Sequence, residues 1–423
     1  RRSNDTVEVM PGSSRRVLGM IMAGGEGTRL FPLTRDRAKP AVPFGGKYRL
    51  IDFVLSNFVN SGIFSIYVMV QFKSQSLIEH LAAGWKFGGL IAEHFISPVP
   101  AQMQHGQTWY KGTADAIYQN LNLIENYQPD LVAVFGADHI YRMDISQMAD
   151  FHRERGALVT VATLPVPRHE ASSFGIVHVE GDGLVADFVE KPSDPPEMPD
   201  RPGYSLASMG NYIFDADFLM TALKELADSE GGGTDFGKHI IPAHLNSRRT
   251  YAYDFATNRL PGEPEGKPTY WRDVGTLDSF YEANMDLRSP DPALNLYNQS
   301  WPLRTAETPN PPAKFVFDEI GRRGQAVQSV VSEGCIVSGG SVRNSVLGKN
   351  VFVHSFAEVE DAVIMDGCRI RRHAKVRRAI IDKYVEIPEG ERIGYDLELD
   401  RQRFTVTESG IVVIPKQPRP VFD

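Results

Sequence analysis

The chain has 423 residues, a formal net charge of −8 at pH 7, and 42% hydrophobic and 23% charged residues. This length exceeds one ordinary core and predicts two or three domains. The acidic balance argues against nucleic acid as the main partner, and no apolar run reaches the roughly 20 residues that a membrane span needs. The only two cysteines, Cys335 and Cys368, are too few for a disulfide framework and indicate reduced, buried thiols in a cytoplasmic protein.

The first predicted element is a buried strand over residues 17–22, which ends in a glycine-rich loop. Residues 1–16 are predicted to form a flexible tail, because no hydrophobic segment follows the arginine pair as an export signal would require. Gly24, Gly25 and Gly27 let backbone N–H groups approach an anion closely. Their spacing fits neither a P-loop nor a dinucleotide fingerprint.

Basic residues follow these glycines. Arg29 and Lys39 can neutralise a bound anion, Arg29 as a planar fork and Lys39 as a point charge. The loop is therefore predicted to cradle a triphosphate at the carboxyl end of the first strand of an α/β sheet, where such sheets bind ligands. A bland turn between strand and helix explains the glycines but leaves the basic residues unexplained.

The next elements alternate between helical and strand patterns, which predicts a mostly parallel sheet covered by helices. The predicted elements are a helix over 50–61, a strand over 66–72, a helix over 75–83, a helix over 113–127 with Thr113 as its N-cap, and a strand over 131–135. Gly112 would let the backbone meet a flat ligand, although a capped helix explains this segment too. Asp138 follows the last strand and suits Mg²⁺, which prefers carboxylate oxygens and substrate phosphates; a turn cap is the plainer alternative.

Four later segments carry polar groups. Glu190 and Lys191 end an alternating strand, where a surface ion pair is the alternative. Ser208 precedes a strand over 212–214. Asp235 begins a helix as either its N-cap or a ligand contact. Asp273 is the second carboxylate that a magnesium site needs, and the neighbouring Trp271 is either a ligand contact or an ordinary packed aromatic residue.

A fixed repeat follows a Pro-, Asn- and Ser-rich linker at 290–312. Four aliphatic triplets have six-residue spacing, and each begins 17 residues after the last. They are Val330, Ile336 and Val342; Leu347, Val353 and Val359; Ile364, Ile370 and Val376; and Ile381, Ile387 and Ile393. A helix cannot keep this period on one face, so residues 313–423 are predicted to form a left-handed parallel β-helix. His354 and His373 define no acyl-acceptor site, so an oligomer-forming role is expected.

The run Gly24-Gly25-x-Gly27-Thr28-Arg29-Leu30, with Pro32-Leu33-Thr34 and Lys39-Pro40, closely resembles the signature loop of sugar-nucleotide pyrophosphorylases. Residues 109–115, 136–141, 205–210 and 270–276 extend the resemblance over nearly the whole chain. They are most similar to the bacterial members that make ADP-glucose. The resemblance implies a catalytic domain over 17–289 with a Rossmann-like sheet, and a reaction of ATP with glucose 1-phosphate that gives ADP-glucose and pyrophosphate for glycogen synthesis.

The resemblance also implies roles for the residues. Arg29, Lys39, Asp138 and Asp273 would be catalytic, with both aspartates binding Mg²⁺. ATP would contact Gly24, Gly25, Gly27, Thr28, Tyr110 and Gly112. Glucose 1-phosphate would contact Glu190, Lys191, Ser208, Asp235 and Trp271. The same chemistry on UTP with glucose 1-phosphate or on GTP with mannose 1-phosphate, and a catalytically silent regulatory subunit, are the alternatives.

Regulation by anionic glycolytic intermediates and a homotetramer are further implications of the resemblance. Arg37 and Arg49 match basic positions of the family near the junction of the two domains. Further candidates for effector binding come from the C-terminal side, where a solvated basic face is an equal alternative: Arg377, Arg378, Arg401 and Arg403. Asp36 stands where the fructose-bisphosphate-activated pattern has a lysine. This departure argues against a bisphosphate activator and leaves a monophosphate or a keto acid open.

Overall fold

A computed structural model describes residues 16–87, 93–101, 109–228 and 233–419. The predicted N-terminal tail lies, except for Arg16, outside the described residues. The chain divides into two compact units. Unit 1 takes residues 1–20, 111–134 and 151–253, and unit 2 takes residues 21–110, 135–150 and 254–423. Each unit is described by itself.

Unit 1 is built on strands that pair mostly antiparallel. Their order is β6-β11-β8-β12-β10-β9, with β6 at Leu131–Gly136, β8 at Val159–Pro167, β9 at Gly175–Glu180, β10 at Leu184–Glu190, β11 at Tyr204–Asp215 and β12 at Thr250–Asp254. The helices are α3 at Thr113–Tyr118, α4 at Leu121–Tyr127, α6 at Arg168–Ala171, α7 at Ala216–Asp228 and α8 at Ile241–His244. The last of these follows a π-helical turn, η3, at Phe236–Ile240. β11 pairs antiparallel with both β6 and β8.

Unit 2 holds the strand order β5-β4-β1 in its N-terminal part, where β4 and β5 are parallel. These strands are β1 at Val17–Ala23, β4 at Ser65–Val70 and β5 at Phe95–Pro100. β1 and β6 each have residues in both units. The helices are α1 at Leu50–Asn60, α2 at Gln75–Gly84 and α9 at Leu277–Asp286, while α5 at Ile145–Glu154 crosses the unit boundary. Short two-stranded ribbons pair β2 at Pro43–Phe44 with β3 at Tyr48–Arg49, and β7 at His139–Tyr141 with β13 at Trp271–Asp273.

Two details differ from the sequence predictions. The predicted α/β fold class is confirmed and β4 pairs parallel with β5, but β11 runs antiparallel to β6 and β8, and β10 runs antiparallel to β9 and β12. The single helix predicted over 113–127 is broken at Gln119 and Asn120, and its N-cap is Gly112. Thr113 fails as the cap because it is already helical and its hydroxyl donates to Asp235 Oδ2 at 3.3 Å.

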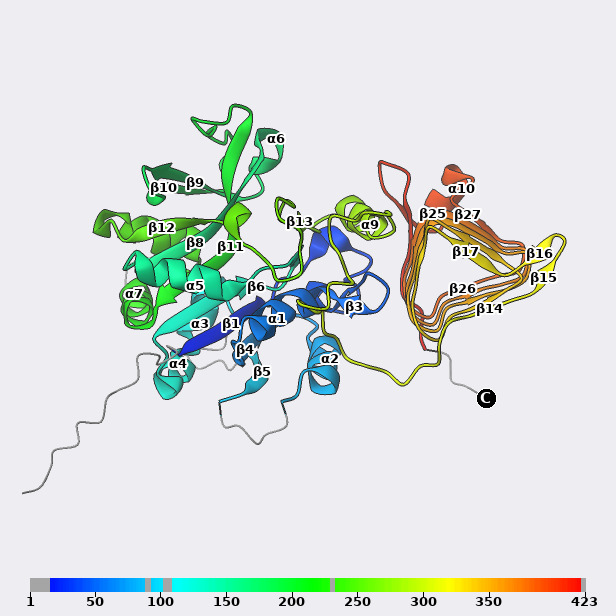
Figure 1. The fold of residues 1–423 in the computed structure, drawn as a ribbon, viewed down its shortest axis with the longest axis horizontal. Helices are drawn as coiled ribbons and strands as arrows, with labels where there is room; N and C mark the ends of the chain where they lie inside the picture. The colour runs from blue at the N-terminus through cyan, green and yellow to red at the C-terminus, as the bar shows by residue number, and fades with distance from the viewer. Residues whose placement is uncertain (1–15, 88–92, 102–108, 229–232, 420–423) are drawn as a thin grey trace, which may run out of the picture. The chain divides into compact units, whose positions relative to one another are not determined.

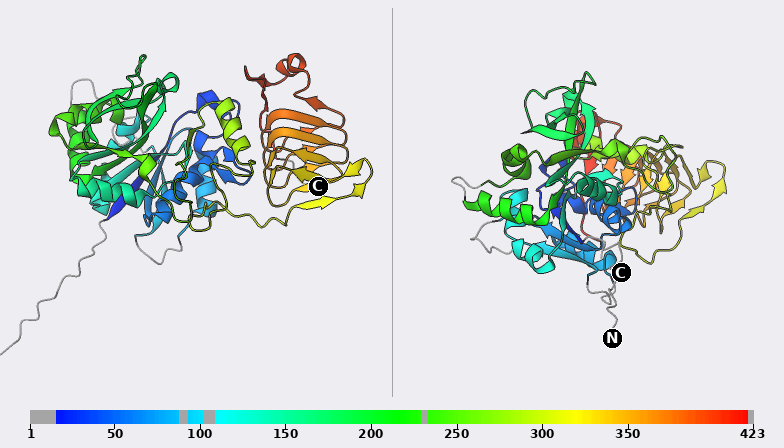
Figure 2. Two further views of the ribbon diagram at one scale, coloured as in Figure 1. Left: turned by 45° about the horizontal axis from the view of Figure 1, so that its top comes forward. Right: turned by 60° about the vertical axis from the view of Figure 1, so that its left-hand side comes forward.

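The C-terminal part of unit 2 is a parallel β-helix, as the repeat predicted. Figure 1 shows its flat sides meeting in a triangle, and the left view of Figure 2 shows its stacked coils. One side has β14 at Lys314–Val316, β19 at Ile336–Ser338, β22 at Phe352–Val353, β24 at Arg369–Ile370 and β26 at Glu386–Ile387. The second has β17 at Gln325–Val327, β20 at Ser341–Arg343, the first half of β23 at Glu358–Ile364, the first half of β25 at Lys375–Ile381, and β27 at Arg392–Ile393. The third has β18 at Val330–Val331, β21 at Val346–Leu347, the ends of β23 and β25, and β29 at Val412–Ile414, which pairs with β28 at Thr405–Val406.

The register confirms the 17-residue coil, because Val359 pairs with Val376 and Ile364 with Ile381. The first coil is one residue shorter. Val331 pairs with Leu347, and Val337 pairs with Val353. The inward positions there belong to Val331 and Val337, so the prediction was wrong by one residue at Val330 and Ile336. A shorter loop between β19 and β20 shifts the register without changing the apolar pattern.

Two apolar clusters lie in unit 2. One fills the β-helix and includes Val342, Val353, Ile370 and Ile387. The other packs aromatic residues such as Phe44, Phe53 and Phe280 against outward-facing β-helix residues, among them Val363 and Ile380. Both cysteines are free and buried, as predicted. No helix in the described part of the chain is long and apolar enough to span a bilayer.

The predicted linker over 290–312 packs closely on the rest of unit 2. Trp301 is buried, and the Thr305 hydroxyl donates to the fully buried Asp52 carboxylate at 2.7 Å. A Cβ on Gly84, at the end of α2, would lie 2.3 Å from the Ala306 Cα. The backbone of this segment therefore passes directly over α2.

Candidate active site

The glycine loop of unit 2 follows β1, and its three glycines have different surroundings. Gly27 has φ +63°, and a Cβ there would lie 2.8 Å from the Lys39 Cβ. Thr34 Oγ1 donates to the Gly27 carbonyl at 2.9 Å. A Cβ on Gly24 would lie 3.2 Å from Gln71, while a Cβ on Gly25 would meet nothing within 4 Å. Gly27 therefore brings the loop onto Lys39, and Gly25 leaves its backbone open on one side.

Lys39 joins the two predicted metal ligands. Its Nζ lies 3.2 Å from Asp138 Oδ2 and 3.6 Å from Asp273 Oδ1, and its side chain is only 8% exposed. Asp138 follows β6, whereas Asp273 ends β13, where it pairs with His139 of β7. The β7–β13 ribbon thus places the second carboxylate beside the first. We call Asp138 and Asp273 the carboxylate pair.

Arg29 and His139 complete the surroundings of the carboxylate pair. A Cβ on Gly275 would lie 2.9 Å from Asp273 Oδ2 and 3.1 Å from Arg29 Nη2, so both side chains converge on this glycine. His139 Nε2 lies 3.6 Å from Asp138 Oδ1 and 3.9 Å from Asp273 Oδ1. The His139 ring packs on Trp271 with centroids 5.0 Å apart.

Two neighbouring side chains, His139 and Lys39, favour the ionised form of the Asp138 carboxyl. Burial opposes ionisation, but the charges of His139 and Lys39 outweigh it and hold the pKa of the Asp138 carboxyl below its usual value. Asp138 is therefore a carboxylate near neutral pH. The donor set fits Mg²⁺, since two hard oxygen ligands converge on one cation. Within the described residues no group of three or more His, Cys, Asp or Glu forms a metal cage.

Tyr110 is held beside the glycine loop by Gln71. The Tyr110 N–H donates to Gln71 Oε1 at 2.8 Å, and Gln71 Nε2 donates to the Tyr110 carbonyl at 3.4 Å. Gln71 is also the residue on which Gly24 packs. Thr28 opens the short 3-10 turn at Thr28–Leu30 and is exposed. The predicted ATP contacts of unit 2 thus gather around β1 and β4.

The predicted sugar-phosphate residues form a second group, in unit 1. Glu190 ends β10, and its Oε1 lies 3.6 Å from Lys191 Nζ. Burial and the nearby Asp235 charge raise the pKa of the Glu190 carboxyl, while Lys191 opposes the rise. Lys191 has φ +49°, a conformation that costs a non-glycine residue about 1 kcal/mol or more. This backbone conformation sets the direction in which the exposed Lys191 side chain leaves the chain.

Asp235 caps the π-helical turn, as one of its two predicted roles required. Its Oδ1 accepts from the backbone N–H groups of Gly237 at 2.9 Å and Lys238 at 3.1 Å. Its Oδ2 accepts from Thr113, which ties the turn to α3. A Cβ on Gly112 would lie 2.2 Å from the Thr234 carbonyl oxygen. This contact by itself requires glycine at position 112, and the predicted contact of Gly112 with a flat ligand stays a prediction.

Ser208 lies at an irregularity in β11. The register against β8 shifts between Ser208 and Tyr212, and the Gly210 N–H donates to Ser208 Oγ at 3.1 Å. Such bulges re-aim side chains and are frequent next to active sites. Ser208 is buried beside Tyr212, whose pKa burial raises well above its usual value.

Comparisons with known proteins identify two family models along the chain. Residues 18–289 match the nucleotidyl transferase family model, and residues 311–414 match the model described as GlmU-like, C-terminal hexapeptide. The glucose-1-phosphate adenylyltransferase of Anaeromyxobacter sp. (strain Fw109-5) is 53% identical over 407 residues, which cover 96% of this chain and 99% of the relative. The chain belongs to the glucose-1-phosphate adenylyltransferase family.

Two further members of this family show the same relationship. The Corynebacterium jeikeium relative is 54% identical over 405 residues, which cover 96% of this chain and 98% of its own. The Thermus thermophilus relative is 54% identical over 406 residues, which cover 95% of this chain and 98% of its own. The predicted resemblance is confirmed over both the nucleotidyl transferase part and the hexapeptide part.

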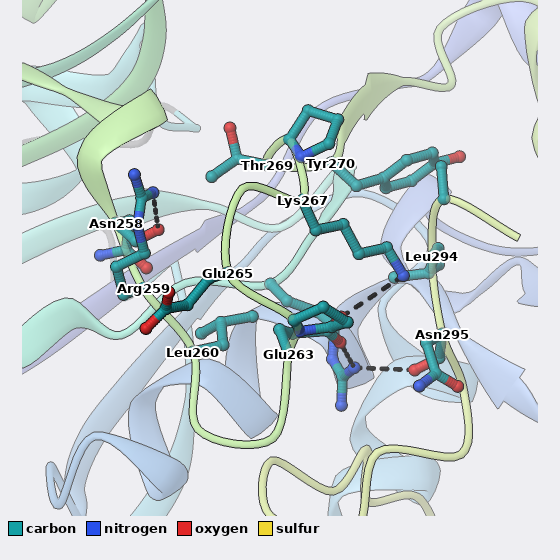
Figure 3. A pocket seen from close by; sticks show the side chains of 14 residues that line it. Asn258, Arg259, Leu260, Glu263, Glu265, Lys267, Thr269, Tyr270, Leu294 and Asn295 are labelled. Carbon is teal, nitrogen blue, oxygen red and sulfur yellow. Dashed lines mark hydrogen bonds and ion pairs between the residues drawn. The ribbon is translucent and has the colours of Figure 1, made fainter.

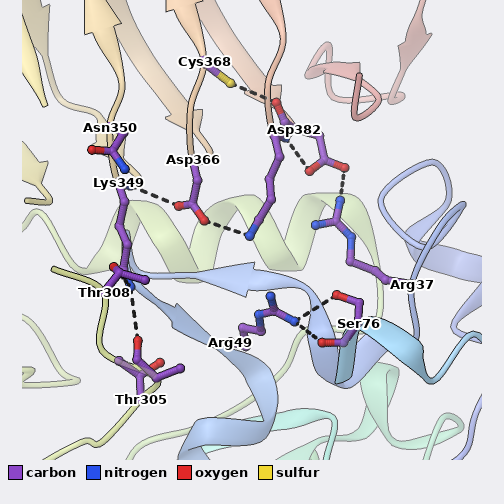
Figure 4. A network of polar contacts seen from close by, with 12 residues as sticks. Arg37, Arg49, Ser76, Thr305, Thr308, Lys349, Asn350, Asp366, Cys368 and Asp382 are labelled. Carbon is purple, nitrogen blue, oxygen red and sulfur yellow. Dashed lines mark hydrogen bonds and ion pairs between the residues drawn. The ribbon is translucent and has the colours of Figure 1, made fainter. Parts of the chain in front are cut away.

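Arg37 and Arg49 lie where the N-terminal segment meets the β-helix within unit 2 (Figure 4). Arg37 is 4% exposed, forms an ion pair with Asp382, and donates through Nε to the Leu33 carbonyl at 3.0 Å. Arg49 Nη1 donates to the Ser76 carbonyl at 2.7 Å. Lys383 pairs with Asp366 at 2.8 Å. Burial lowers the pKa of both Arg49 and Lys383, and neighbouring cations lower them further.

Of the four C-terminal arginines, Arg377 and Arg378 lie on β25, Arg401 ends the helix α10 at Leu397–Arg401, and Arg403 follows that helix. Arg377 packs over the Tyr395 ring at 4.5 Å, and Arg378 donates to the Ser409 carbonyl at 3.3 Å. Arg401 pairs with Glu398, and Arg403 pairs with Glu391 at 2.9 Å. All four are exposed. Most of these partners are local in sequence, although the Arg378 guanidinium also lies 5.9 Å from the centroid of the Tyr281 ring in α9.

A cavity of about 520 Å³ lies before β13 in unit 2 (Figure 3). Arg142, Glu263, Lys267 and Tyr270 are among the residues that line it. Three of its charged residues pair with one another: Arg142 Nη1 lies 3.2 Å from Glu263 Oε1, and Lys267 Nζ lies 3.4 Å from Glu263 Oε2. The lining includes none of the site residues predicted from the sequence.

The sequence reasoning missed three contacting residues. His139 stood inside a recognised motif but had no assigned role, although its place directly after Asp138 was a usable signal. Gln71 directly follows β4 and forms hydrogen bonds with the backbone of Tyr110. Thr113 was assigned only a capping role. Gln71 and Thr113 carried no local signal, because their partners lie far away in the sequence.

Proposed function

We propose that the chain transfers the adenylyl group of ATP to glucose 1-phosphate, giving ADP-glucose and pyrophosphate. Two findings support this: the family membership, and the convergence of Lys39, Asp138 and Asp273 beside an open glycine loop. ADP-glucose made in this way is the glucosyl donor for glycogen synthesis.

The proposed chemistry is one in-line displacement. A phosphate oxygen of glucose 1-phosphate attacks the α-phosphorus of ATP, the bond from that phosphorus to the bridging oxygen breaks, and pyrophosphate leaves with its electron pair. The nucleophile is already an anion, so it needs neither a covalent enzyme intermediate nor a strong base. The enzyme must hold two mutually repelling anions in line, so positioning and charge neutralisation carry the catalysis.

The residues of unit 2 take the nucleotide in this proposal. Gly24, Gly25, Gly27 and Thr28 present backbone N–H groups to the phosphates, and Arg29 and Lys39 neutralise the leaving pyrophosphate. Asp138 and Asp273 would hold Mg²⁺, which when bound supplies charge neutralisation and alignment of the phosphates. Tyr110, with Gly112 of unit 1, would contact the nucleoside.

The residues of unit 1, together with Trp271, would bind the sugar phosphate. Lys191 pairs with the phosphate, for which its exposed side chain and fixed backbone suit it. Glu190, Ser208 and Asp235 accept or donate hydrogen bonds to sugar hydroxyls. The raised pKa of Glu190 supports this role, because a partly desolvated carboxyl gains more from a hydroxyl donor than a solvated one does.

A nucleotide panel tests the proposal. Pyrophosphate release is measured with ATP, UTP and GTP, each with glucose 1-phosphate and with mannose 1-phosphate. The proposal requires ATP with glucose 1-phosphate to give the highest kcat/KM. A preference for UTP with glucose 1-phosphate, or for GTP with mannose 1-phosphate, would show that the enzyme catalyses the same reaction on that other substrate pair. Absence of turnover with every pair would favour a silent regulatory subunit.

We also propose that anionic glycolytic metabolites regulate the enzyme through Arg37 and Arg49. The basic group that these residues form with Lys383 supports an anion site, because burial and mutual repulsion favour a neutralising ligand. Arg377, Arg378, Arg401 and Arg403 are weaker candidates, since all four are exposed and the last two already pair with Glu398 and Glu391. A homotetramer and a cytoplasmic location complete the proposal, the latter supported by two free, buried thiols.

A further inference from the structure

The Lys39 ammonium lies between the two carboxylates that are proposed to hold the metal. We propose that Lys39 competes with the divalent cation for the carboxylate pair, so that the cation binds there tightly only together with the nucleotide. This inference rests on the proposed function, since it takes Asp138 and Asp273 as the cation ligands. It adds a second role for Lys39, before any phosphate is bound.

The geometry gives Lys39 little freedom. Its side chain is 8% exposed, and Nζ lies 3.2 Å from Asp138 and 3.6 Å from Asp273. Gly27 packs on the stem, where even a Cβ would approach the Lys39 Cβ to 2.8 Å. An ammonium has three donors and no acceptor, so its low-energy position is between acceptors. That position is also the one that any cation drawn to both carboxylates would take.

Two cations cannot share this position at low cost. A divalent ion bound by Asp138 and Asp273 would lie close to the Lys39 ammonium, and like charges at such separations repel strongly in a partly buried site. Binding of the ion alone must therefore displace the ammonium. His139 adds to the crowding, because its Nε2 approaches both carboxylates within 3.9 Å and its ring is held by Trp271.

A triphosphate removes the conflict. It gives the ammonium a new anionic partner, and the loop that would present it is adjacent, because Gly27 touches the Lys39 stem and Gly25 is open. Once Lys39 pairs with phosphate, the carboxylate pair is available for the cation. Binding of nucleotide and of cation is then positively coupled, and linkage makes the coupling equal in both directions.

The test measures binding of Mn²⁺ by the electron paramagnetic resonance signal of the free ion. The proteins are wild type, Lys39→Met, Lys39→Gln and Lys39→Arg, with Lys47→Met as a control that removes an exposed positive charge elsewhere in unit 2. Each is titrated alone and with an ATP analogue that carries a methylene group between the α- and β-phosphorus. Circular dichroism checks that each variant is folded.

Without nucleotide, Lys39→Met and Lys39→Gln should bind Mn²⁺ roughly tenfold more tightly than wild type, as expected for loss of one partly buried competing charge. Lys39→Arg and Lys47→Met should stay near wild type. The analogue should increase Mn²⁺ affinity less in Lys39→Met than in wild type. The two increases should differ by the same roughly tenfold factor that separates the proteins without nucleotide. Unchanged or weaker Mn²⁺ binding in both neutral variants would overturn the competition, because removal of a mere structural lysine does not tighten cation binding.

Asp138→Asn separates this inference from the function on which it rests. If that variant binds Mn²⁺ as wild type does, with and without the analogue, the proposed metal ligands are wrong and the inference falls with them. If it loses Mn²⁺ binding while the neutral Lys39 variants gain none, the ligands are right and only the competition is wrong. If a neutral Lys39 variant is unfolded, the other neutral variant and Lys39→Arg still give the comparison.

Discussion

Lys39, Asp138 and Asp273 come from three separate stretches of the sequence, yet one ammonium contacts both carboxylates. Each residue type was recognisable in its own motif. The contact itself depends on β7 and β13, which pair Asp273 with His139. At the scale of residues, a recognisable motif thus supplies the chemical group, while its partner comes from packing.

Asp138→Asn removes one of the two charges that would hold the cation. We expect kcat to fall by about 10²–10³ or more, as for loss of one electrostatic stabiliser in other enzymes, with the thermal midpoint little changed. Steady-state kinetics at saturating ATP and glucose 1-phosphate measure this. Asp187→Asn, at an exposed carboxylate of β10, is the control. Near-normal turnover of Asp138→Asn would remove this residue from the proposed mechanism.

Lys191→Gln tests the sugar-phosphate group of unit 1. Loss of a charge-assisted contact should raise the KM for glucose 1-phosphate by about tenfold or more, with little change in the KM for ATP. Lys224→Gln, at an exposed lysine paired with Glu125, is the matched control. An effect on ATP alone would contradict the assignment.

Glu190 gives a stability prediction with a defined sign. Its pKa is raised in the folded protein, so the fold favours the protonated carboxyl. The stability that this residue contributes is therefore present below its unfolded pKa and is lost as pH rises through the folded pKa. Glu190→Gln should raise the thermal midpoint relative to wild type at pH 8, and the difference should vanish near pH 4. If the difference in thermal midpoint between Glu190→Gln and wild type grew as the pH fell, the pKa of Glu190 would be lowered by folding and not raised.

At the scale of elements, the β-helix joins the N-terminal segment of unit 2 through polar and apolar contacts. Arg37 pairs with Asp382, directly after β25, and the surrounding core includes Phe44 and Val363. Both charged groups are almost fully buried, with side-chain exposures of 5% and 0%. Such a pair stabilises little compared with apolar packing, but loss of one partner leaves a buried charge alone.

Arg37→Met should therefore destabilise the protein by about 3–5 kcal/mol. Arg35→Met is the matched control, because its pair with Asp36 is 44% exposed on each side and should contribute at most about 1 kcal/mol. Urea unfolding followed by circular dichroism measures both. The double variant Arg37→Met/Asp382→Leu should recover part of the loss. Equal effects of Arg37→Met and Arg35→Met would show that the buried pair contributes nothing special.

At the scale of the whole molecule, the proposed regulation would act through the basic group of Arg37, Arg49 and Lys383 beside the β-helix. Since Arg37 already pairs with Asp382, Arg49 is the better candidate for contact with an anionic effector. Its guanidinium donates only to Ser76 among the described contacts of that group. Asp36 forms an ion pair with Arg35, with Nη2 and Oδ2 2.9 Å apart. The negative charge of Asp36 argues against binding of a second phosphate group beside it.

Fructose 6-phosphate or pyruvate should therefore activate the enzyme more strongly than fructose 1,6-bisphosphate. Arg49→Gln should raise the effector concentration for half-activation by about tenfold or more, through loss of one charge-assisted contact, and leave activity without effector near wild type. Initial rates across effector concentrations measure this, with Arg343→Gln, at an exposed arginine of β20, as the control. A flat response of the wild type to all three compounds would remove the regulatory proposal.

The sequence alone determined the features that neighbouring residues carry. The 17-residue coil is a local period, so it could be read directly, and it placed Val353, Ile370 and Ile387 in the β-helix core as found. The glycine loop and the two aspartate motifs were likewise readable, because short motifs keep their residues together. Family membership follows from the same motifs and is confirmed by relatives at 53% and 54% identity.

Only the tertiary structure decided the rest, because it depends on contacts between distant segments. The break in the helix after α3, the antiparallel pairing of β11, and the one-residue shift of the first coil have no local signal. The same holds for the reason that position 112 is glycine, which is the Thr234 carbonyl. The position of Lys39 between two carboxylates also depends on the tertiary structure. The sequence shows that Lys39 is basic, but the packing of Gly27 and the pairing of β7 with β13 determine which carboxylates lie beside it.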